Sequence, residues 1–223
     1  MEKTQKELEQ QLLDAREACR VLCERPETSH ASLQQCVAAM EKVREAERAL
    51  TAFLNDQYAV PLDLGFHPDS GVSAPLLLQT ESSAILAFSA VTNHVAGSFS
   101  KDGTAIVEFK SCYWSTFGYP NDEAMDGHPL WGRGLSNYGI FDVHNSPWRR
   151  RMTEQNRVAF PNTKDDSSTR HLIFTFHDST FECLCEGIKS ASFSTAPFEE
   201  LFSEITKRGL QKYDGWWHPP SKG

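Results

Sequence analysis

The sequence predicts an α+β protein, in which an N-terminal antiparallel helical hairpin precedes a mainly antiparallel β-sheet domain with two short flanking helices. Residues 1–58 repeat apolar side chains at three- and four-residue spacing, which is typical of one buried helix face. Later apolar runs are short and follow one another through brief Gly- and Pro-containing links, an order that favours antiparallel over parallel pairing. We therefore divide the 223-residue chain into a hairpin, 1–58, and a sheet domain, 59–223.

The hairpin consists of two expected helices. Leu8 and Leu12 begin the apolar face of the first, and Pro26 ends that helix because proline cannot continue it. The second helix is expected to run to about Asn55, with an inward face made of Leu33, Val37, Met40, Val43, Ala46, Leu50 and Leu54. Such a pair can dock on its own domain or pair with a second copy as a four-helix bundle. We expect docking or a homodimer through this hairpin.

The first part of the sheet domain is read as a Pro- and Gly-rich linker, followed by strands. We expect strands at 76–80, 83–91, 94–100 and 104–110, and 112–119 is a further strand candidate. Lys101-Asp102-Gly103 has the composition of a hairpin turn, with glycine supplying a positive φ. A Gly- and Pro-rich loop is expected at 120–137.

The second part alternates strands with the two short helices. Strands are expected at 138–144, 171–177 and 181–188. The helices are expected at 147–158, where Asn145 or Ser146 would cap and Pro147 would take the first position, and at 197–208.

Composition and charge narrow the class of protein. A net charge of −8 makes nucleic acid an unlikely partner, because phosphate attraction needs clustered basic residues and only Arg149-Arg150-Arg151 offers them. No run is long and apolar enough for a membrane span, so no membrane partner is expected. The six cysteines lack metal-site spacing; we interpret them as reduced thiols and expect a cytoplasmic location. No metal is expected, and the cofactor is unknown.

Two similar seven-residue segments, identical at four positions, give the candidate catalytic residues. Residues 140–146 and 173–179 each read as an apolar strand that ends in His, then Asn or Asp, then Ser. Two such strands side by side would bring His144 and His177 to one end of a sheet, with Asp178 orienting an imidazole that acts as a general base. The competing interpretation is local: Asn145 and Ser146 cap a helix, and Asp178 forms a turn.

The candidate ligand-binding residues come from the 120–137 loop and from the strand ends. His128, Trp131 and Arg133 combine flexible backbone, an aromatic ring and a cation, a mixture suited to an anionic or flat ligand. Asn145 and Glu182 would add polar contacts. In the competing interpretation, Trp131 only anchors the loop, Arg133 is solvated, and Glu182 lies on a solvated sheet face.

These patterns support two classes of function. The first is a cytosolic ligand-binding or protein-interaction protein that holds a small polar or anionic ligand, or a partner segment, in a cleft formed by the 120–137 loop and the two strand ends. The alternative is a hydrolytic or metal-assisted enzyme with His177 or His144 as general base. The sequence leaves open whether the protein is an enzyme.

Overall fold

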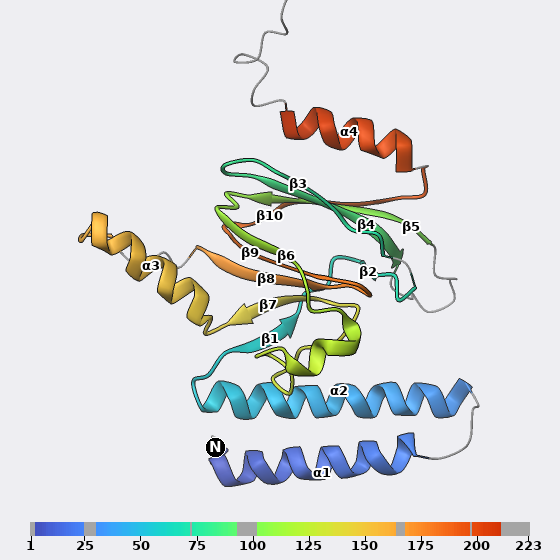
Figure 1. Ribbon diagram of the computed structural model, residues 1–223. Coiled ribbons are helices and arrows are strands. Elements are labelled where there is room, and N and C mark those ends of the chain that lie inside the picture. Colours follow the sequence, from blue (N-terminus) through green and yellow to red (C-terminus); the bar gives the residue numbers. More distant parts are fainter. Residues whose placement is uncertain are drawn as a thin grey trace, which may run out of the picture.

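In the computed structural model, two β-sheets pack face to face, with a helical hairpin at one end and a single helix at the other (Figure 1). The structure describes residues 3–24, 30–71, 73–92, 102–163, 168–196 and 198–210. The predicted α+β class, with its helix pair followed by antiparallel sheets, is confirmed. None of the helices in these ranges is long and apolar enough to cross a membrane.

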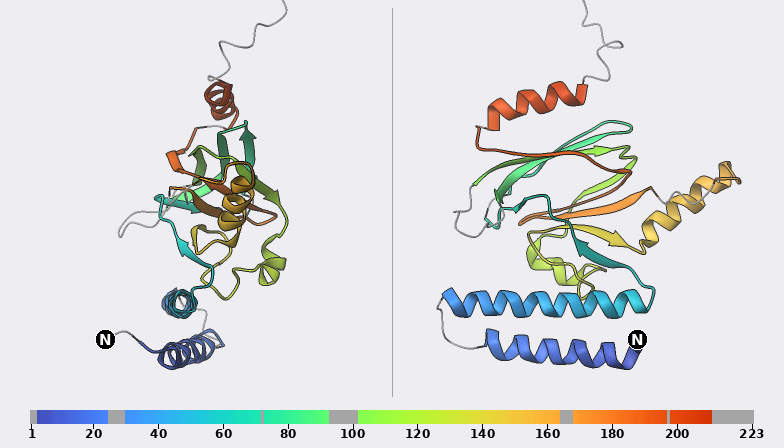
Figure 2. Two further views of the ribbon diagram at one scale, coloured as in Figure 1. Left: turned by 90° about the vertical axis from the view of Figure 1, so that its left-hand side faces the viewer. Right: turned by 180° about the vertical axis from the view of Figure 1, so that it is seen from behind.

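The hairpin consists of α1 (Gln5–Cys23) and α2 (His30–Phe53). Thr4 caps α1 with its side chain, and Glu7 bonds back to the Thr4 backbone, so two free N–H groups of the helix start are satisfied. Helix α2 lies between α1 and the sheets (Figures 1 and 2). Leu8 and Leu12 of α1 are buried, as the apolar spacing predicted. The expected inward face of α2 is wrong for four residues that are exposed, namely Leu33, Val37, Met40 and Leu54.

Cys23 and Cys36 form a disulfide between α1 and α2. The interpretation of all six cysteines as reduced thiols is therefore wrong for these two. Their Cα atoms lie 5.4 Å apart, because the antiparallel packing of the helices brings together positions 13 residues apart in sequence. Cys19, Cys112, Cys183 and Cys185 are free.

The first sheet, here called the β8 sheet after its central strand, is antiparallel throughout and has the order β1-β7-β8-β9-β6. Its strands are β1 (Tyr58–Pro61), β6 (Trp114–Gly118), β7 (Ile140–His144), β8 (Arg170–Thr175) and β9 (Thr180–Cys185).

The second sheet, here called the β4 sheet, has the order β10-β5-β4-β2, and β3 also pairs with β4. Its strands are β2 (Phe66–Pro68), β3 (Leu76–Gln79), β4 (Ala84–Thr92), β5 (Asp102–Lys110) and β10 (Gly187–Ser194).

Three sequence expectations in the sheets need correction. The expected linker after Tyr58 contains two strands, β1 and β2, and 187–194 forms β10, which begins at a glycine with φ of +140°. The expected turn at 101–103 is also wrong, because Asp102 and Gly103 pair with β4. A side chain at Gly103 would meet the Ser194 backbone oxygen at 2.5 Å, so close approach of β10 explains the glycine. The expected strand 94–100 lies outside the described residues.

The main core lies between the two sheets and is dominated by phenylalanines. Phe174 and Phe181 of the β8 sheet contact Phe88 and Phe109 of the β4 sheet, with ring centroids 5.4 to 6.1 Å apart. Phe174, Phe181, Cys183 and their neighbours on the same strand faces are almost fully buried, as alternation along the strands requires.

Loops and helices cover the outer faces of both sheets. The 120–137 loop, which contains the 3₁₀ helix η1 (Asp122–Gly127), packs Met125, Leu130 and Leu135 onto the outer face of the β8 sheet. Helix α4 (Phe198–Leu210) packs Ile205 onto the β4 sheet. Helix α3 (Pro147–Ala159) has no buried residue and projects to the side (Figure 1).

Candidate functional site

Glu182 lies on the outer face of β9 between two histidines. His171 Nε2 is 2.8 Å from Glu182 Oε2, and His128 Nε2 is 3.4 Å from Oε1. His171 belongs to the adjacent strand β8, and His128 follows η1 in the 120–137 loop. The Glu182 side chain is 17% exposed and the two imidazoles less than 10%, so the cluster is almost closed to water.

The hydrogen bonds at the Nδ1 atoms of His128 and His171 determine which nitrogen of each ring donates to Glu182. The Leu130 N–H donates to His128 Nδ1, so the proton of that ring is on Nε2 and points to Glu182. The Ser146 hydroxyl accepts from the Arg149 N–H and is 2.9 Å from His171 Nδ1, to which it can donate. His171 then donates through Nε2 to Glu182.

The carboxyl of Glu182 stays ionised at ordinary pH. Burial alone would raise its pKa, but the hydrogen bonds from His128 and His171 outweigh burial and lower the pKa to about 2. Both oxygens of the carboxylate are hydrogen bonded, so the group is a fixed negative charge within a rigid network.

A cavity of about 400 Å³ opens beside this network. Residues from the 120–137 loop, from strands β6, β8 and β9, from the start of α3 and from the position before β1 form its wall. The lining residues are Gln57, Thr116, His128, Pro129, Leu130, Pro147, Trp148, Arg151, His171 and Glu182. This is a concave surface with an aromatic ring, neutral polar groups and one charge of each sign, the composition expected of a small-molecule site.

The first turn of α3 supplies the aromatic ring and the cation of the cavity. Ser146 caps the helix through its hydroxyl, and Pro147 takes the first position, as the sequence predicted. Trp148 packs edge-on against His171, with centroids 5.2 Å apart. Arg151 is exposed and lines the cavity, and its guanidinium has no hydrogen bond or ion pair within the described part of the chain.

His177 belongs to a second polar cluster. Its Nδ1 is 2.9 Å from Asp122 Oδ2, the Tyr138 hydroxyl donates to the same oxygen, and Tyr138 stacks on the His177 ring. The hydrogen bond to Asp122 raises the pKa of His177. The hydrogen bonds that Asp122 accepts, first from Tyr138 and second from His177 in size of effect, lower the pKa of Asp122. The hydrogen bond to Asp122 raises the pKa of Tyr138 to about 12. Asp178, the expected orienting residue, is exposed in the turn before β9, so Asp122 takes that place.

The expected meeting of His144 and His177 is wrong. Strands β7 and β8 do lie side by side, but they are antiparallel, with Asp142 opposite Leu172 and Ile140 opposite Phe174. His144 therefore lies beside the start of β8, whereas His177 follows its end. At ~3.3 Å per residue the two imidazoles are roughly 20 Å apart along the strand direction, too far to act on one atom.

The remaining candidates do not line the cavity. His144 is exposed and stacks on Tyr58. Asn145 donates to the Asp56 backbone oxygen, and Arg133 forms a 2.6 Å ion pair with the Asp56 carboxylate. Trp131 is 44% exposed. Of the predicted ligand-binding set, only His128 and Glu182 line the cavity.

Sequence reasoning missed most of the cavity residues. His171, Trp148 and Arg151 come from a strand start and a helix turn that meet only in the folded chain. One signal was available, since His171 directly precedes the apolar run 172–174 and faces the same side as Ile173, a position where a polar residue needs a partner. The described residues contain no group of three or more His, Cys, Asp or Glu arranged to hold a metal ion.

Comparison with known proteins gives no relative. No family model matches the chain, and no curated protein or solved structure shows a significant match to it.

Proposed function

We propose that the protein binds a small molecule with an anionic group and a flat apolar part in the cavity beside Glu182. Arg151 is the observation that carries the proposal, because it is a cation without a protein partner in the described residues and it lines a concave wall. Unpaired arginines at such walls suit carboxylates and phosphates, which accept two parallel N–H bonds.

The other residues of the cavity set the shape and polarity of this ligand. Trp148 offers an apolar face and Gln57 and Thr116 offer neutral hydrogen-bonding groups. Glu182 is negative, but both of its oxygens are already bonded to histidines, so it restricts where the anionic group can lie and directs it toward Arg151. The His128–Glu182–His171 network holds the cavity floor in place.

Benzoate and its neutral counterpart benzamide test the proposal as probes in isothermal titration calorimetry. Benzoate should bind and benzamide should bind at least tenfold more weakly, because a hydrogen bond to a charged group contributes about 1.5–3 kcal/mol. Arg151→Ala should remove the preference for benzoate. Arg150→Ala is the matched control, since Arg150 lies on the same helix, bonds the Asn145 backbone oxygen and does not line the cavity.

Two results would contradict this proposal. One is equal binding of benzoate and benzamide by the unaltered chain. The other is an equal loss of benzoate binding in the Arg150 and Arg151 variants, which would indicate general attraction to a basic helix. Native mass spectrometry of the freshly purified chain is a parallel test, because a retained ligand would add mass that disappears in Arg151→Ala.

The alternative function is an enzyme in which His177 is the general base. It is favoured by the Asp122–His177 pair, in which the carboxylate holds Nδ1 and Nε2 has no partner among the described residues. Hydrolysis of p-nitrophenyl acetate tests this function. His177→Ala should abolish the turnover, and His67→Ala, which removes an exposed imidazole in β2, should remove only its background contribution. Equal rates in both variants would exclude a special role for His177 with this ester.

Self-association through the hairpin is a separate proposal. Leu33, Val37 and Met40 recur at helical spacing on α2, and all three are exposed. Light scattering should give twice the 25.1 kDa chain mass for the unaltered protein and the single mass for Val37→Asp. Phe160→Asp, at another exposed apolar residue, should leave the mass doubled. A monomer in the unaltered chain would contradict the proposal.

The cytoplasmic location stays a prediction, and one of its supports is lost. It relied on six reduced cysteines, whereas Cys23 and Cys36 are bonded, and disulfides persist mainly in oxidising compartments. Alkylation of cysteine thiols in acid-quenched cell lysates would test the predicted location, because a cytosolic chain should show Cys23 and Cys36 largely reduced.

A further inference from the structure

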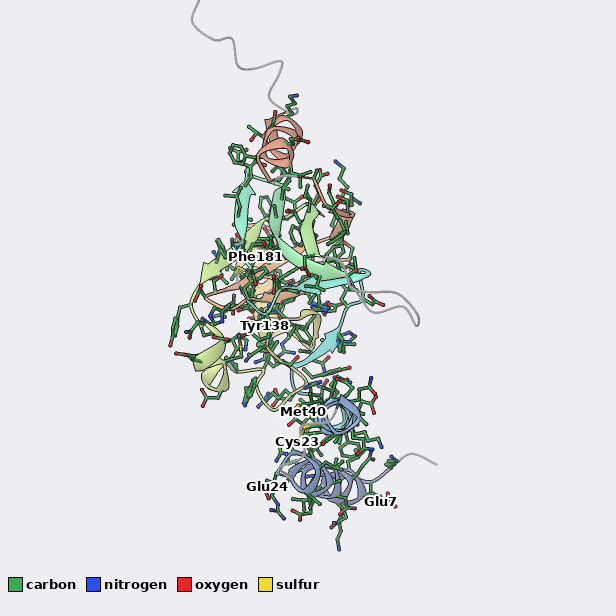
Figure 3. All side chains as sticks on the ribbon, turned by 90° about the vertical axis from the view of Figure 1, so that its right-hand side faces the viewer. Glu7, Cys23, Glu24, Met40, Tyr138 and Phe181 are labelled. Atoms are coloured by element: carbon green, nitrogen blue, oxygen red, sulfur yellow. A yellow bond between two sulfur atoms is a disulfide. The ribbon has the colours of Figure 1, made fainter. Side chains whose placement is uncertain are left out.

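Three sulfur atoms gather at the end of the hairpin where the chain turns from α1 to α2. Cys23 is bonded to Cys36, and the free thiol sulfur of Cys19 is 3.8 Å from the Cys23 sulfur. Figure 3 places Cys23 between the two helices. Cys19 and Cys36 are half-buried and Cys23 is exposed, whereas the other three cysteines are buried in the core.

We propose that these residues form a thiol–disulfide exchange site, in which Cys19 displaces Cys36 from Cys23. The exchange replaces a cross-link between α1 and α2 by one within α1. It does not depend on the proposed ligand, because the cluster lies in the hairpin and contributes no residue to the cavity.

The step is balanced without an added oxidant or reductant. Cys19 loses its proton to water, and its thiolate attacks the Cys23 sulfur. The Cys19–Cys23 bond forms while the Cys23–Cys36 bond breaks, and Cys36 leaves as a thiolate that takes a proton from water. One disulfide and one thiol are present before and after. Cys23 is the sulfur attacked, because it is the one in contact with Cys19.

Helix geometry makes the two disulfides unequal. Positions four residues apart in a helix have Cβ atoms about 5–6 Å apart, whereas a disulfide needs roughly 3.5–4.5 Å. A Cys19–Cys23 bond therefore requires the last turn of α1 to adjust. Cys23 is the final residue of α1, so this adjustment disrupts no later turn. The form that joins the helices should be the more abundant one.

Exchange would release the turn end of the hairpin. Helix α1 packs mainly on α2, so its position depends on that contact. After exchange the two helices are held by apolar packing at Leu8 and Leu12 and by the Arg16–Glu47 ion pair. Leu33 and Val37, which are exposed close to Cys36 in sequence, belong to the part of α2 that would lose its covalent tie.

Disulfide mapping of the full chain tests the inference. The protein is purified without reductant, incubated at pH 8, quenched with acid, alkylated with N-ethylmaleimide under denaturing conditions and digested with trypsin and a Glu-specific protease. Cleavage then separates the cysteines, with Cys19 in 18–20, Cys23 in 21–24 and Cys36 in 28–41. Label should start on Cys19 and appear on Cys36 with time, together with a 19–23 disulfide. Cys19→Ser should lose this change completely.

Cys36→Ser provides a second test that does not require the original disulfide to form first. In a glutathione redox buffer this variant should form the 19–23 disulfide. Three results would overturn the inference: label that stays on Cys19 alone at every time, two reduced cysteines in Cys36→Ser, or alkylation of all three residues in the unaltered chain before any reductant is added.

Discussion

At Glu182 two opposing effects act on one carboxyl group, and the hydrogen bonds are the stronger. Burial favours the neutral acid, whereas His128 and His171 favour the anion and bring the pKa to about 2 from an ordinary value of 4.5. A lowered pKa in the folded chain stabilises the fold above the ordinary pKa, and that contribution is lost as pH falls toward the folded value. The shift corresponds to about 3 kcal/mol.

Glu182→Gln should therefore be less stable than the unaltered chain at pH 6, and the difference should shrink between about pH 4.5 and pH 2. Urea unfolding of both proteins across this range measures it. A constant difference down to pH 2 would mean that the carboxylate is not the group that titrates in the network.

The pKa of His177, which follows the end of β8, is shifted in the opposite direction, upward. Its pKa is raised mainly by the hydrogen bond to Asp122, so the stabilisation is complete below the ordinary value of 6.5 and is lost as pH rises through the folded value. Asp122→Asn should return the pKa of His177 toward 6.5. Titration of the imidazole resonances by NMR measures the change, and an unaltered pKa would contradict the pairing.

At the scale of elements, the start of α3 links helix stability to the cavity. The Ser146 hydroxyl accepts from the Arg149 N–H, as a capping residue does, and is also the partner of His171. Thr4 has a capping role on α1 without any such second partner outside its own helix. The two caps therefore form a natural comparison.

Ser146→Ala should cost about 1–3 kcal/mol of unfolding free energy, because it removes a cap and leaves His171 Nδ1 without a partner. Thr4→Ala should cost about 1 kcal/mol or less. Chemical denaturation measures both, and benzoate titration should be weakened only in Ser146→Ala. Equal costs and unaltered binding would show that the Ser146–His171 bond contributes nothing.

At the scale of the whole molecule, the face-to-face packing of the sheets explains why a site can be built on the outer face of one of them. Phe88, Phe109, Phe174 and Phe181 fill the space between the sheets, so the β8 sheet is held rigidly from behind. The 120–137 loop is then fixed by packing on the opposite face. A side chain at Gly134, where φ is +93°, would collide with the Ala59 backbone oxygen, so the loop follows β1 closely.

Phe174→Ala should destabilise the protein by about 3–5 kcal/mol, since it leaves a cavity among three other rings. Phe117→Ala makes the same change in β6, where the ring is 41% exposed, and should cost clearly less. Thermal and urea unfolding of the two variants provide the measurement. Similar losses would contradict the assignment of the core to the space between the sheets.

The sequence alone determined the features that depend on neighbours along the chain. Helical spacing predicted α1 and α2, short apolar runs predicted strands where β8 and β9 lie, and the Asn145-Ser146-Pro147 segment predicted the start of α3. These are set by contacts within a few residues, which a sequence displays directly.

Tertiary structure decided the site, because several of its defining contacts join segments far apart in the chain. The antiparallel register of β7 and β8 separated His144 from His177, although their sequence environments are alike. Glu182 meets His128 across 54 residues, and His177 meets Asp122 across 55. Strand pairing and sheet packing select such partners from many alternatives of similar local composition, so no pattern within one segment could identify them.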